Sequence, residues 1–177
     1  MSAAYDLINM QSDFVTQRLV LSSLTVDRQE FILELVNTPG WLRFIGDRKI
    51  LTPGDARAYI DKINQSQIFK YWVAELKNEK IPIGIVTFIK RDYLEFYDIG
   101  FAFLPAYSKT GYALEATAEV LNYLSREHLV DHLLATTVPD NTNSIRLLKK
   151  LGFELEREIE VEGEGLLVYG LLLTPAG

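Results

Sequence analysis

The sequence predicts a mixed α/β domain, in which one central sheet carries helices on both faces. Runs with strand composition alternate with amphipathic segments of helical period, in the order β-α-α-β-β-β-α-β-α-β-β. Two strands, 94–104 and 133–138, flank a helix and are therefore expected to be parallel, whereas short turns join most other neighbours. The 177 residues are 48% hydrophobic, which suffices for one domain with a full core.

The composition argues against several classes of function. Lys and Arg number 18 against 24 Asp and Glu, and the resulting net charge of −6 disfavours nucleic acid as a partner. The chain has no cysteine, which excludes a Cys nucleophile, disulfides and thiolate metal sites, and we predict no metal site. Residues 1–13 lack the basic start and apolar run of a signal peptide, and no apolar stretch is long enough to span a membrane. We therefore expect a cytoplasmic protein without a membrane partner.

The first half of the chain predicts one strand and two helices, over residues 18–26, 28–37 and 52–67. The strand is rich in apolar and β-branched side chains, and Asp27 is a suitable cap for the helix that follows. Thr52 and Pro53 are typical of a helix cap and a first helical position. The aromatic segment 41–45 between the helices is expected to be a loop that either caps the core or forms a wall of a binding cleft.

Three strands are predicted next, over residues 71–76, 81–90 and 94–104. Their separators are short enough for hairpins, so the three should be antiparallel neighbours. The alternation of the third strand falters at residues 99–101, where Gly100 permits a bulge.

The last third predicts a helix, a strand, a helix and two strands, over residues 110–126, 133–138, 140–151 and 153–173, with the final two strands joined across 162–165. We expect one domain over residues 1–177, with an N-terminal extension (1–15) and a flexible tail (174–177).

Residues 101–113 run from a strand through a short loop into a helix. The free N–H groups and the positive dipole end at such a helix start are suited to a phosphate group. Gly111 permits close approach of the backbone to a ligand, and the small Ala113 leaves space beside it.

Four motifs together resemble the GNAT superfamily of acetyl-CoA-dependent N-acetyltransferases, and most of all its Rim-type branch of ribosomal-protein N-terminal acetyltransferases. They are Thr16-Gln-Arg-Leu-Val-Leu, Asp98-Ile-Gly-Phe-Ala-Phe-Leu-Pro, Gly111-Tyr-Ala-Leu-Glu-Ala116, and Asn141-x-x-Ser144 with Leu151-Gly-Phe153. The resemblance covers about residues 16–172. It implies a GNAT-like fold, in which strands 94–104 and 133–138 splay around acetyl-CoA.

The family's phosphate signature, Gln/Arg-x-x-Gly-x-Gly/Ala, falls on Ser108-x-x-Gly111-x-Ala113. Ser108 replaces Gln or Arg, and Lys109 stands where the branch usually has glycine, which is unfavourable if φ must be positive there. The Lys109 ammonium either contacts phosphate or is solvated, and the same two options apply to the basic face at 146–150. The resemblance implies cofactor contacts from Phe101, Phe103, Ser108, Lys109, Thr110, Gly111, Tyr112, Ala113 and Asn141.

Acetyl transfer to an amine requires a proton acceptor, because amine pKa values lie between about 8 and about 10.4. Asp98 is the preferred candidate and Glu95 the alternative, since regular alternation places only one of them toward the cleft. Ser144 is the candidate acid for the departing thiolate, and helix capping is its other possible role. Backbone N–H groups near 101–103 are candidates to stabilise the carbonyl oxygen.

The sequence therefore predicts an acetyl-CoA-dependent N-acetyltransferase that acts directly on a primary amine, either a protein N-terminus or a small amine. The alternative is a catalytically weak acyl-CoA-binding regulatory module, which the departures at Ser108 and Lys109 suggest. Trp41 and Phe44 are the candidate acceptor-binding residues. We expect a monomer or homodimer whose partners are acetyl-CoA and the acceptor.

Overall fold

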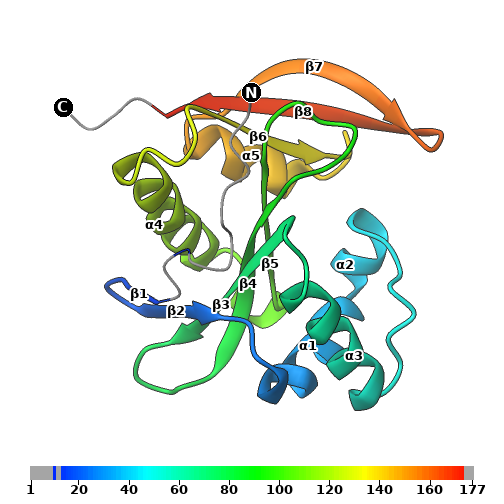
Figure 1. The fold of residues 1–177 in the computed structure, drawn as a ribbon, viewed down its shortest axis with the longest axis vertical. Coiled ribbons are helices and arrows are strands. Elements are labelled where there is room, and N and C mark those ends of the chain that lie inside the picture. The colour runs from blue at the N-terminus through cyan, green and yellow to red at the C-terminus, as the bar shows by residue number, and fades with distance from the viewer. Residues whose placement is uncertain (1–9, 11–12, 174–177) are drawn as a thin grey trace.

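The computed structural model describes residue 10 and residues 13–173; the rest of the predicted N-terminal extension and the predicted tail lie outside the described residues. Eight strands form one sheet in the order β1-β2-β3-β4-β5-β6-β8-β7 (Figure 1). The strands are β1 (Phe14–Val15), β2 (Leu19–Ser23), β3 (Phe69–Leu76), β4 (Pro82–Ile89), β5 (Asp98–Phe103), β6 (His132–Thr137), β7 (Glu154–Val161) and β8 (Glu164–Leu172). The helices are α1 (Gln29–Val36), α2 (Pro39–Phe44), α3 (Pro53–Asn64), α4 (Tyr112–Arg126) and α5 (Thr142–Lys150).

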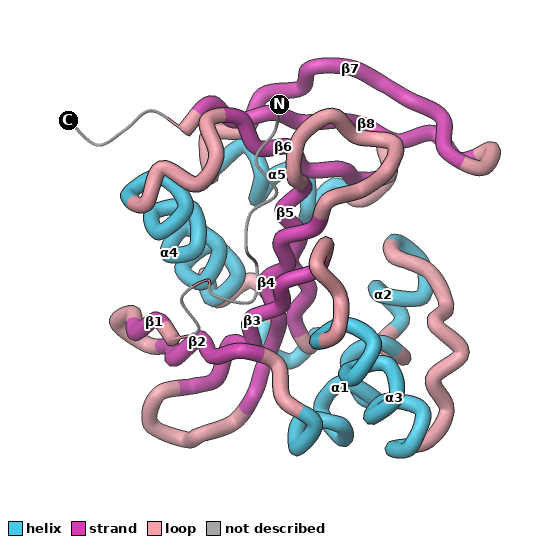
Figure 2. Tube along the Cα trace, in the orientation of Figure 1, coloured by secondary structure: helices cyan, strands magenta, loops and turns pink. Residues whose placement is uncertain are grey.

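Helices cover both faces of the sheet, as predicted (Figure 2). One core lies between the sheet and α1, α2 and α3, and it includes Ile32, Trp41 and Ile60. The second core lies on the opposite face, where Val120 of α4 and Leu148 of α5 pack. The predicted mixed α/β class is confirmed, because β5 and β6 are parallel while every other neighbouring pair is antiparallel. No helix among the described residues has the length and apolarity that crossing a membrane requires.

The prediction of a loop over residues 41–45 was wrong, because a short helix, α2, occupies residues 39–44. Its start carries local signals: Pro39 lies in the first turn, and the Thr38 hydroxyl accepts a hydrogen bond from the Trp41 N–H. The Thr52 cap was predicted correctly, and Asp55 completes a capping box with it at the start of α3.

The expected bulge at residues 99–101 was also wrong. The register between β4 and β5 is regular from Gly84↔Phe103 to Ile89↔Asp98. The register irregularities that the described strands show lie elsewhere, between β3 and β4 and between β7 and β8. Gly100 is needed instead for a close approach, since a Cβ atom there would lie 2.7 Å from Thr87 Oγ1.

The parallel strands β5 and β6 part directly after they meet. Asp98↔Leu134 is the one residue pair that joins them in the described chain, and the Leu134 N–H donates to the Tyr97 carbonyl at 2.9 Å. The Leu104 N–H donates to the Ile83 carbonyl of β4, at 2.8 Å. Because backbone groups alternate in direction along a strand, the N–H and C=O of Phe101 and Phe103 point away from β4, toward β6. Without a partner strand at that level, these groups face an open gap.

Candidate active site

The gap between β5 and β6 leads to the start of α4 through a tightly bonded loop. The hydroxyl of Ser108 donates to the carbonyl of Pro105 at 2.5 Å, and the hydroxyl of Thr110 donates to the carbonyl of Tyr107 at 2.6 Å. These bonds close the turn without using the backbone N–H groups that follow. The hydroxyl groups of Ser108 and Thr110 therefore hold the conformation of the predicted phosphate loop through hydrogen bonds inside the loop.

Two residues of this loop adopt left-handed backbone conformations, Lys109 with φ 61° and Gly111 with φ 85°. Lys109 thus occupies a conformation that glycine adopts at lower cost, as the comparison with the family signature suggested. The lysine at this position therefore does not prevent the loop from adopting the positive φ.

Six consecutive backbone N–H groups, from residue 109 to residue 114, have no hydrogen-bond acceptor within the described chain. The first internal bond at this helix start runs from Glu115 N–H to the carbonyl of Gly111, at 3.0 Å. α4 has 15 residues, so its dipole adds partial positive charge at this end. The arrangement fits a pyrophosphate group, whose oxygens accept several N–H bonds.

Arg18 and Glu115 form an ion pair at this loop that the sequence analysis did not identify. Arg18 Nε lies 2.7 Å from Glu115 Oε2, and its Nη1 donates to the Thr110 carbonyl at 2.9 Å. The Thr16 hydroxyl donates to the same carboxylate at 2.6 Å. Burial raises the pKa of Glu115, but the bonds from Thr16 and Arg18 outweigh that effect, so the pKa lies below its usual value. All three residues lie within motifs that carried the family resemblance, which was the available signal.

Asp98 lies at the point where β5 and β6 part, and its side chain is 2% exposed. Its Oδ2 atom accepts from Arg91 Nε and from the Thr136 hydroxyl, both at 3.0 Å. Burial raises the pKa of the Asp98 carboxyl, and the bonds from Arg91 and Thr136 offset only part of that rise. The carboxylate is therefore a stronger base than a solvated aspartate.

Glu95, the other predicted carboxylate, lies in the connection between β4 and β5. Its side chain is 51% exposed, and Oε2 lies 2.6 Å from Nη2 of Arg157 on β7. A hydrogen bond from its own backbone, together with the nearby Arg157, lowers the pKa of Glu95, while burial acts in the opposite direction. Of the two candidates, Asp98 is thus the one at the base of the gap with a raised pKa.

Asn141 and Ser144 begin α5, beside the end of β6. The Asn141 side chain serves as the helix cap, because its Oδ1 accepts from the Ser144 N–H at 3.3 Å. The Ser144 hydroxyl has no hydrogen-bond partner within the described chain. The capping role thus belongs to Asn141, which leaves the Ser144 hydroxyl available for another partner.

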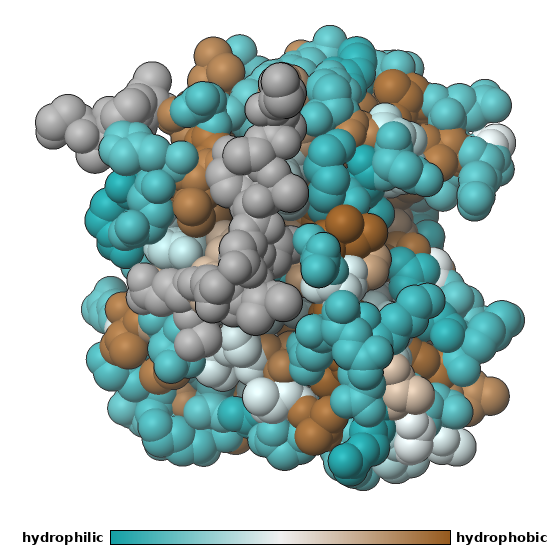
Figure 3. All heavy atoms as spheres, in the orientation of Figure 1, coloured by the Kyte–Doolittle hydropathy of each residue, from teal (hydrophilic) through white to brown (hydrophobic). Residues whose placement is uncertain are grey.

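The two predicted acceptor-binding residues differ in exposure. Trp41 is 5% exposed in the core of α1–α3, and its indole N–H donates to the Gly46 carbonyl at 3.1 Å. The ring of Phe44 is partly exposed beneath the guanidinium of Arg43, 4.8 Å away. Arg43 Nη2 also lies 2.8 Å from Asp140 Oδ2, so it links α2 to the segment before α5. The space-filling view shows the surface hollowed at its right edge, between the β7–β8 hairpin and α2 (Figure 3).

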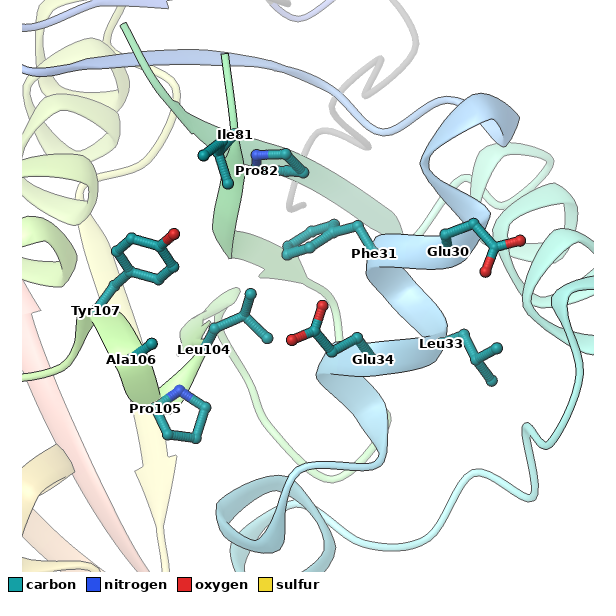
Figure 4. A pocket seen from close by; sticks show the side chains of 10 residues that line it. All are labelled: Glu30, Phe31, Leu33, Glu34, Ile81, Pro82, Leu104, Pro105, Ala106 and Tyr107. Atoms are coloured by element: carbon teal, nitrogen blue, oxygen red, sulfur yellow. The ribbon is translucent and has the colours of Figure 1, made fainter. Parts of the chain in front are cut away.

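A separate open pocket of about 680 Å³ lies between α1 and the connection from β5 to α4 (Figure 4). Phe31 and Glu34 point toward it from α1, and Leu104 and Tyr107 from the connection. It borders the phosphate loop on the side of the sheet that α1–α3 cover.

Comparisons with known proteins agree with this geometry. The model of the acetyltransferase (GNAT) domain matches residues 18–154. The chain is 30% identical over 141 residues to the N-acetyltransferase YnaD of Bacillus subtilis, covering 80% of this chain and 82% of the relative. A GNAT-family acetyltransferase of Bacillus anthracis superposes with a TM-score of 0.77 at 27% identity, covering 90% of this chain and 98% of that one. The ribosomal-protein-S5-alanine acetyltransferase of Vibrio fischeri shares the fold, with a TM-score of 0.77 at 17% identity over 92% of this chain and 97% of that one. The chain therefore belongs to the GNAT family of acetyltransferases.

Proposed function

We propose that this acyltransferase moves the acetyl group of acetyl-CoA directly onto a primary amine. The observation that carries the proposal is that β5, whose backbone groups lose their partner where β5 and β6 part, runs directly into the loop with free N–H groups at the start of α4. When bound, acetyl-CoA supplies an activated thioester, in which the C–S bond breaks as the acceptor nitrogen forms a C–N bond. Direct transfer agrees with the absence of cysteine from the sequence.

The residues of the loop and the residues of the gap bind different parts of acetyl-CoA. The N–H groups of residues 109–114 hold the pyrophosphate, and Lys109 adds a positive charge beside it. The free backbone groups of Phe101 and Phe103 pair with the amide groups of the pantetheine arm, as an added strand would. One of these N–H groups, rather than a carbonyl, stabilises the negative charge that develops on the thioester carbonyl oxygen, an effect of roughly 3 kcal/mol for one donor.

Asp98 receives the proton of the acceptor amine through the Thr136 hydroxyl. Asp98 itself is buried, but Thr136 donates to it and is partly exposed on the same face of the sheet. A proton that enters the Thr136 oxygen can leave toward Asp98 along the existing 3.0 Å bond. Ser144, whose hydroxyl is free in the described chain, donates a proton to the departing sulfur.

The regulatory alternative was suggested by the departures at Ser108 and Lys109. Lys109 nevertheless holds a φ of 61°, and Ser108 closes the turn through its hydroxyl. Both substitutions are thus accommodated in a loop that keeps its N–H groups free, and turnover is the function that the site supports best.

The proposal is tested by measuring CoA release from acetyl-CoA against a panel of small amines, amino acids, polyamines and N-terminal peptides. Calorimetry of CoA binding is run on the same preparation. We expect CoA to bind and at least one amine class to increase CoA release well above background hydrolysis. Binding without transfer to any class would favour the regulatory alternative, and no binding would overturn both.

A further inference from the structure

Arg91 follows β4 directly, and the turn that leads toward β5 holds its backbone in place. The Leu94 N–H donates to the Arg91 carbonyl at 3.3 Å, and the Lys90 ammonium donates to the carbonyls of both residues. Leu94 is 2% exposed, because it packs against Leu134 of β6 and Val168 of β8. The position of this turn therefore depends on apolar packing and backbone bonds, and it does not require the Arg91 side chain.

The guanidinium of Arg91 makes the one ion pair that Asp98 has among the described residues. Its Nε lies 3.0 Å from Asp98 Oδ2, and the Thr136 hydroxyl donates to the same oxygen at 3.0 Å. The Arg91 side chain is 33% exposed, whereas that of Asp98 is 2% exposed. The guanidinium carbon also lies 5.9 Å from the centre of the Tyr93 ring, where cation and ring attract each other weakly. Arg91 thus brings a positive charge from the surface to a carboxylate that water hardly reaches.

The other titratable groups that act on this ion pair are two uncharged phenols. They belong to Tyr93, in the same connection, and to Tyr71 of β3. Burial raises the pKa of both phenols, so both stay neutral around pH 7. The neighbours of Asp98 in the sheet, Ile89 of β4 and Leu134 of β6, are apolar. Within the described residues, one guanidinium alone therefore balances the charge of this carboxylate.

The balance between burial and this guanidinium decides at which pH Asp98 is ionised. A protonated carboxyl cannot receive the proton of an amine, and burial favours the protonated form. Burial raises the pKa of Asp98, and Arg91 lowers it. Without the positive charge, Asp98 would stay protonated up to a higher pH. The bond also orients the carboxylate, since the donors from Arg91 and Thr136 converge on the same oxygen, Oδ2.

We propose that Arg91 is a positioning residue that keeps Asp98 ionised and turned toward Thr136, and that it thereby sets the lower pH limit of acetyl transfer. The inference rests on the proposed function, because it takes Asp98 to be the group that receives the amine proton. Arg91 acts through Asp98 and transfers no proton itself, because a guanidinium stays protonated throughout the pH range of the reaction.

The experiment measures kcat/KM for one acceptor amine across a range of pH, in the wild type and in Arg91→Gln. Glutamine keeps a hydrogen-bond donor and removes the charge, and the ionisation of the amine cancels in the ratio of variant to wild type. This ratio should be near one in alkaline solution and should fall by about tenfold or more in acid, as expected when the pKa of Asp98 rises by about one unit or more. A ratio that is the same at every pH would overturn the inference, because the loss of a purely structural contact does not move the pH profile.

Two further variants test whether the charge is responsible. Arg91→Lys keeps the charge, so its ratio should stay closer to one in acid than the ratio of Arg91→Gln. Arg157→Gln is the matched control, because Arg157 is 35% exposed and pairs with Glu95 of the same connection, at 2.6 Å. The ratio for this control should not vary with pH. A fall in acid as large as that of Arg91→Gln, in either of these two variants, would overturn the inference.

NMR of isotope-labelled aspartate carboxyl groups follows the titration of Asp98 without any turnover. The Asp98 signal is assigned by its loss in Asp98→Asn, and its midpoint should lie about one pH unit or more higher in Arg91→Gln than in the wild type. An unchanged midpoint would overturn the inference and leave acetyl transfer intact. A raised midpoint with a constant kinetic ratio would show that Asp98 is not the proton acceptor, which also overturns the role of Arg91 in the reaction. A raised midpoint in a protein that acetylates no amine would support the control of Asp98 by Arg91 and refute the proposed function.

Discussion

At the scale of single residues, substitution of Asp98 tests whether this side chain is a proton acceptor or a structural anchor. Asp98→Asn keeps the shape of the side chain and removes its charge, so we expect CoA binding to persist and kcat/KM to fall by about 10² to 10⁴. The loss should be greatest near neutral pH, where the acceptor is mostly ammonium, and should decrease toward the pKa of the amine. Rate profiles against pH, normalised to folded protein, provide the measurement.

A different result is expected if Asp98 has only a structural role. Its bonds to Arg91 and Thr136 also tie β5 to β6 and to the connection before β5. If Asp98 only anchors these segments, the variant will unfold at lower temperature while its turnover per folded molecule stays near the wild-type value. Glu95→Gln is the matched control, and it should change turnover little because Glu95 is half exposed and paired with Arg157.

Single residues were predictable from the sequence where their role is local. The cap at Thr52, for example, follows from a few neighbouring positions. The partners of Asp98 were not predictable, because Thr136 is 38 positions away and meets Asp98 only through the parallel pairing of β5 and β6. Likewise, the burial of Trp41 depends on how α1, α2 and α3 pack together.

At the scale of elements, the connection from β5 to α4 tests the position of the cofactor. Gly111→Val adds a branched side chain at φ 85°, where its Cβ atom would lie 3.2 Å from Arg18 Nη2. We expect calorimetric affinity for CoA to fall at least tenfold, because the loop loses both its conformation and its space for phosphate.

Gly163→Val provides the matched control for this substitution. Gly163 has a φ of 82° in the turn between β7 and β8, and an added Cβ atom there would meet no heavy atom within 4 Å. The control thus has similar backbone strain away from the loop, and it should retain CoA affinity even if its thermal stability falls. Equal affinities in wild type and Gly111→Val would show that the pyrophosphate does not bind to this loop.

The ion pair between Arg18, which directly precedes β2, and Glu115 of α4 predicts a pH-dependent contribution to stability. Glu115→Gln should lower the free energy of unfolding at pH 7 by about 1–2 kcal/mol, because Thr16 and Arg18 lose a charged acceptor. The folded-state pKa of Glu115 lies below the value of 4.5 for a free glutamate. The difference between variant and wild type is therefore present above pH 4.5 and disappears as the pH falls through the lower, folded-state pKa. Denaturant unfolding at a series of pH values checks this, and a difference that stays constant in acid would contradict it.

Helices and strands with a clear hydrophobic periodicity in the sequence were predicted, and those without one were not. β1 has two residues, which is too short for any pattern, and it forms only by pairing with β2. Residues 94–97 have strand composition but lie outside β5, because Leu94 leaves the strand path to pack on Leu134 and Val168. The parting of β5 and β6 depends on the positions of both strands in the sheet, and no local signal specifies it.

At the scale of the whole molecule, the protein must bind a multiply anionic cofactor while its own net charge is −6. Local positive charge has to offset the repulsion, and Lys109 and the basic residues of α5, Arg146, Lys149 and Lys150, are available for this. If these side chains act on CoA, calorimetric affinity should weaken as salt rises, because added ions screen exposed charges over about 10 Å at 0.1 M.

Lys109→Gly separates charge from conformation at the phosphate loop. Glycine adopts the φ of 61° observed for Lys109 at lower cost, so the variant should keep the loop while removing its ammonium. We expect a weaker affinity at low salt and a flatter dependence on salt, with the two proteins converging as the salt concentration rises. Lys80→Gly is the control, because Lys80 also has a positive φ of 62° but lies in the turn between β3 and β4. If affinity is independent of salt in the wild type, the N–H groups and the dipole of α4 alone bind the phosphate, and the charge of Lys109 does not contribute.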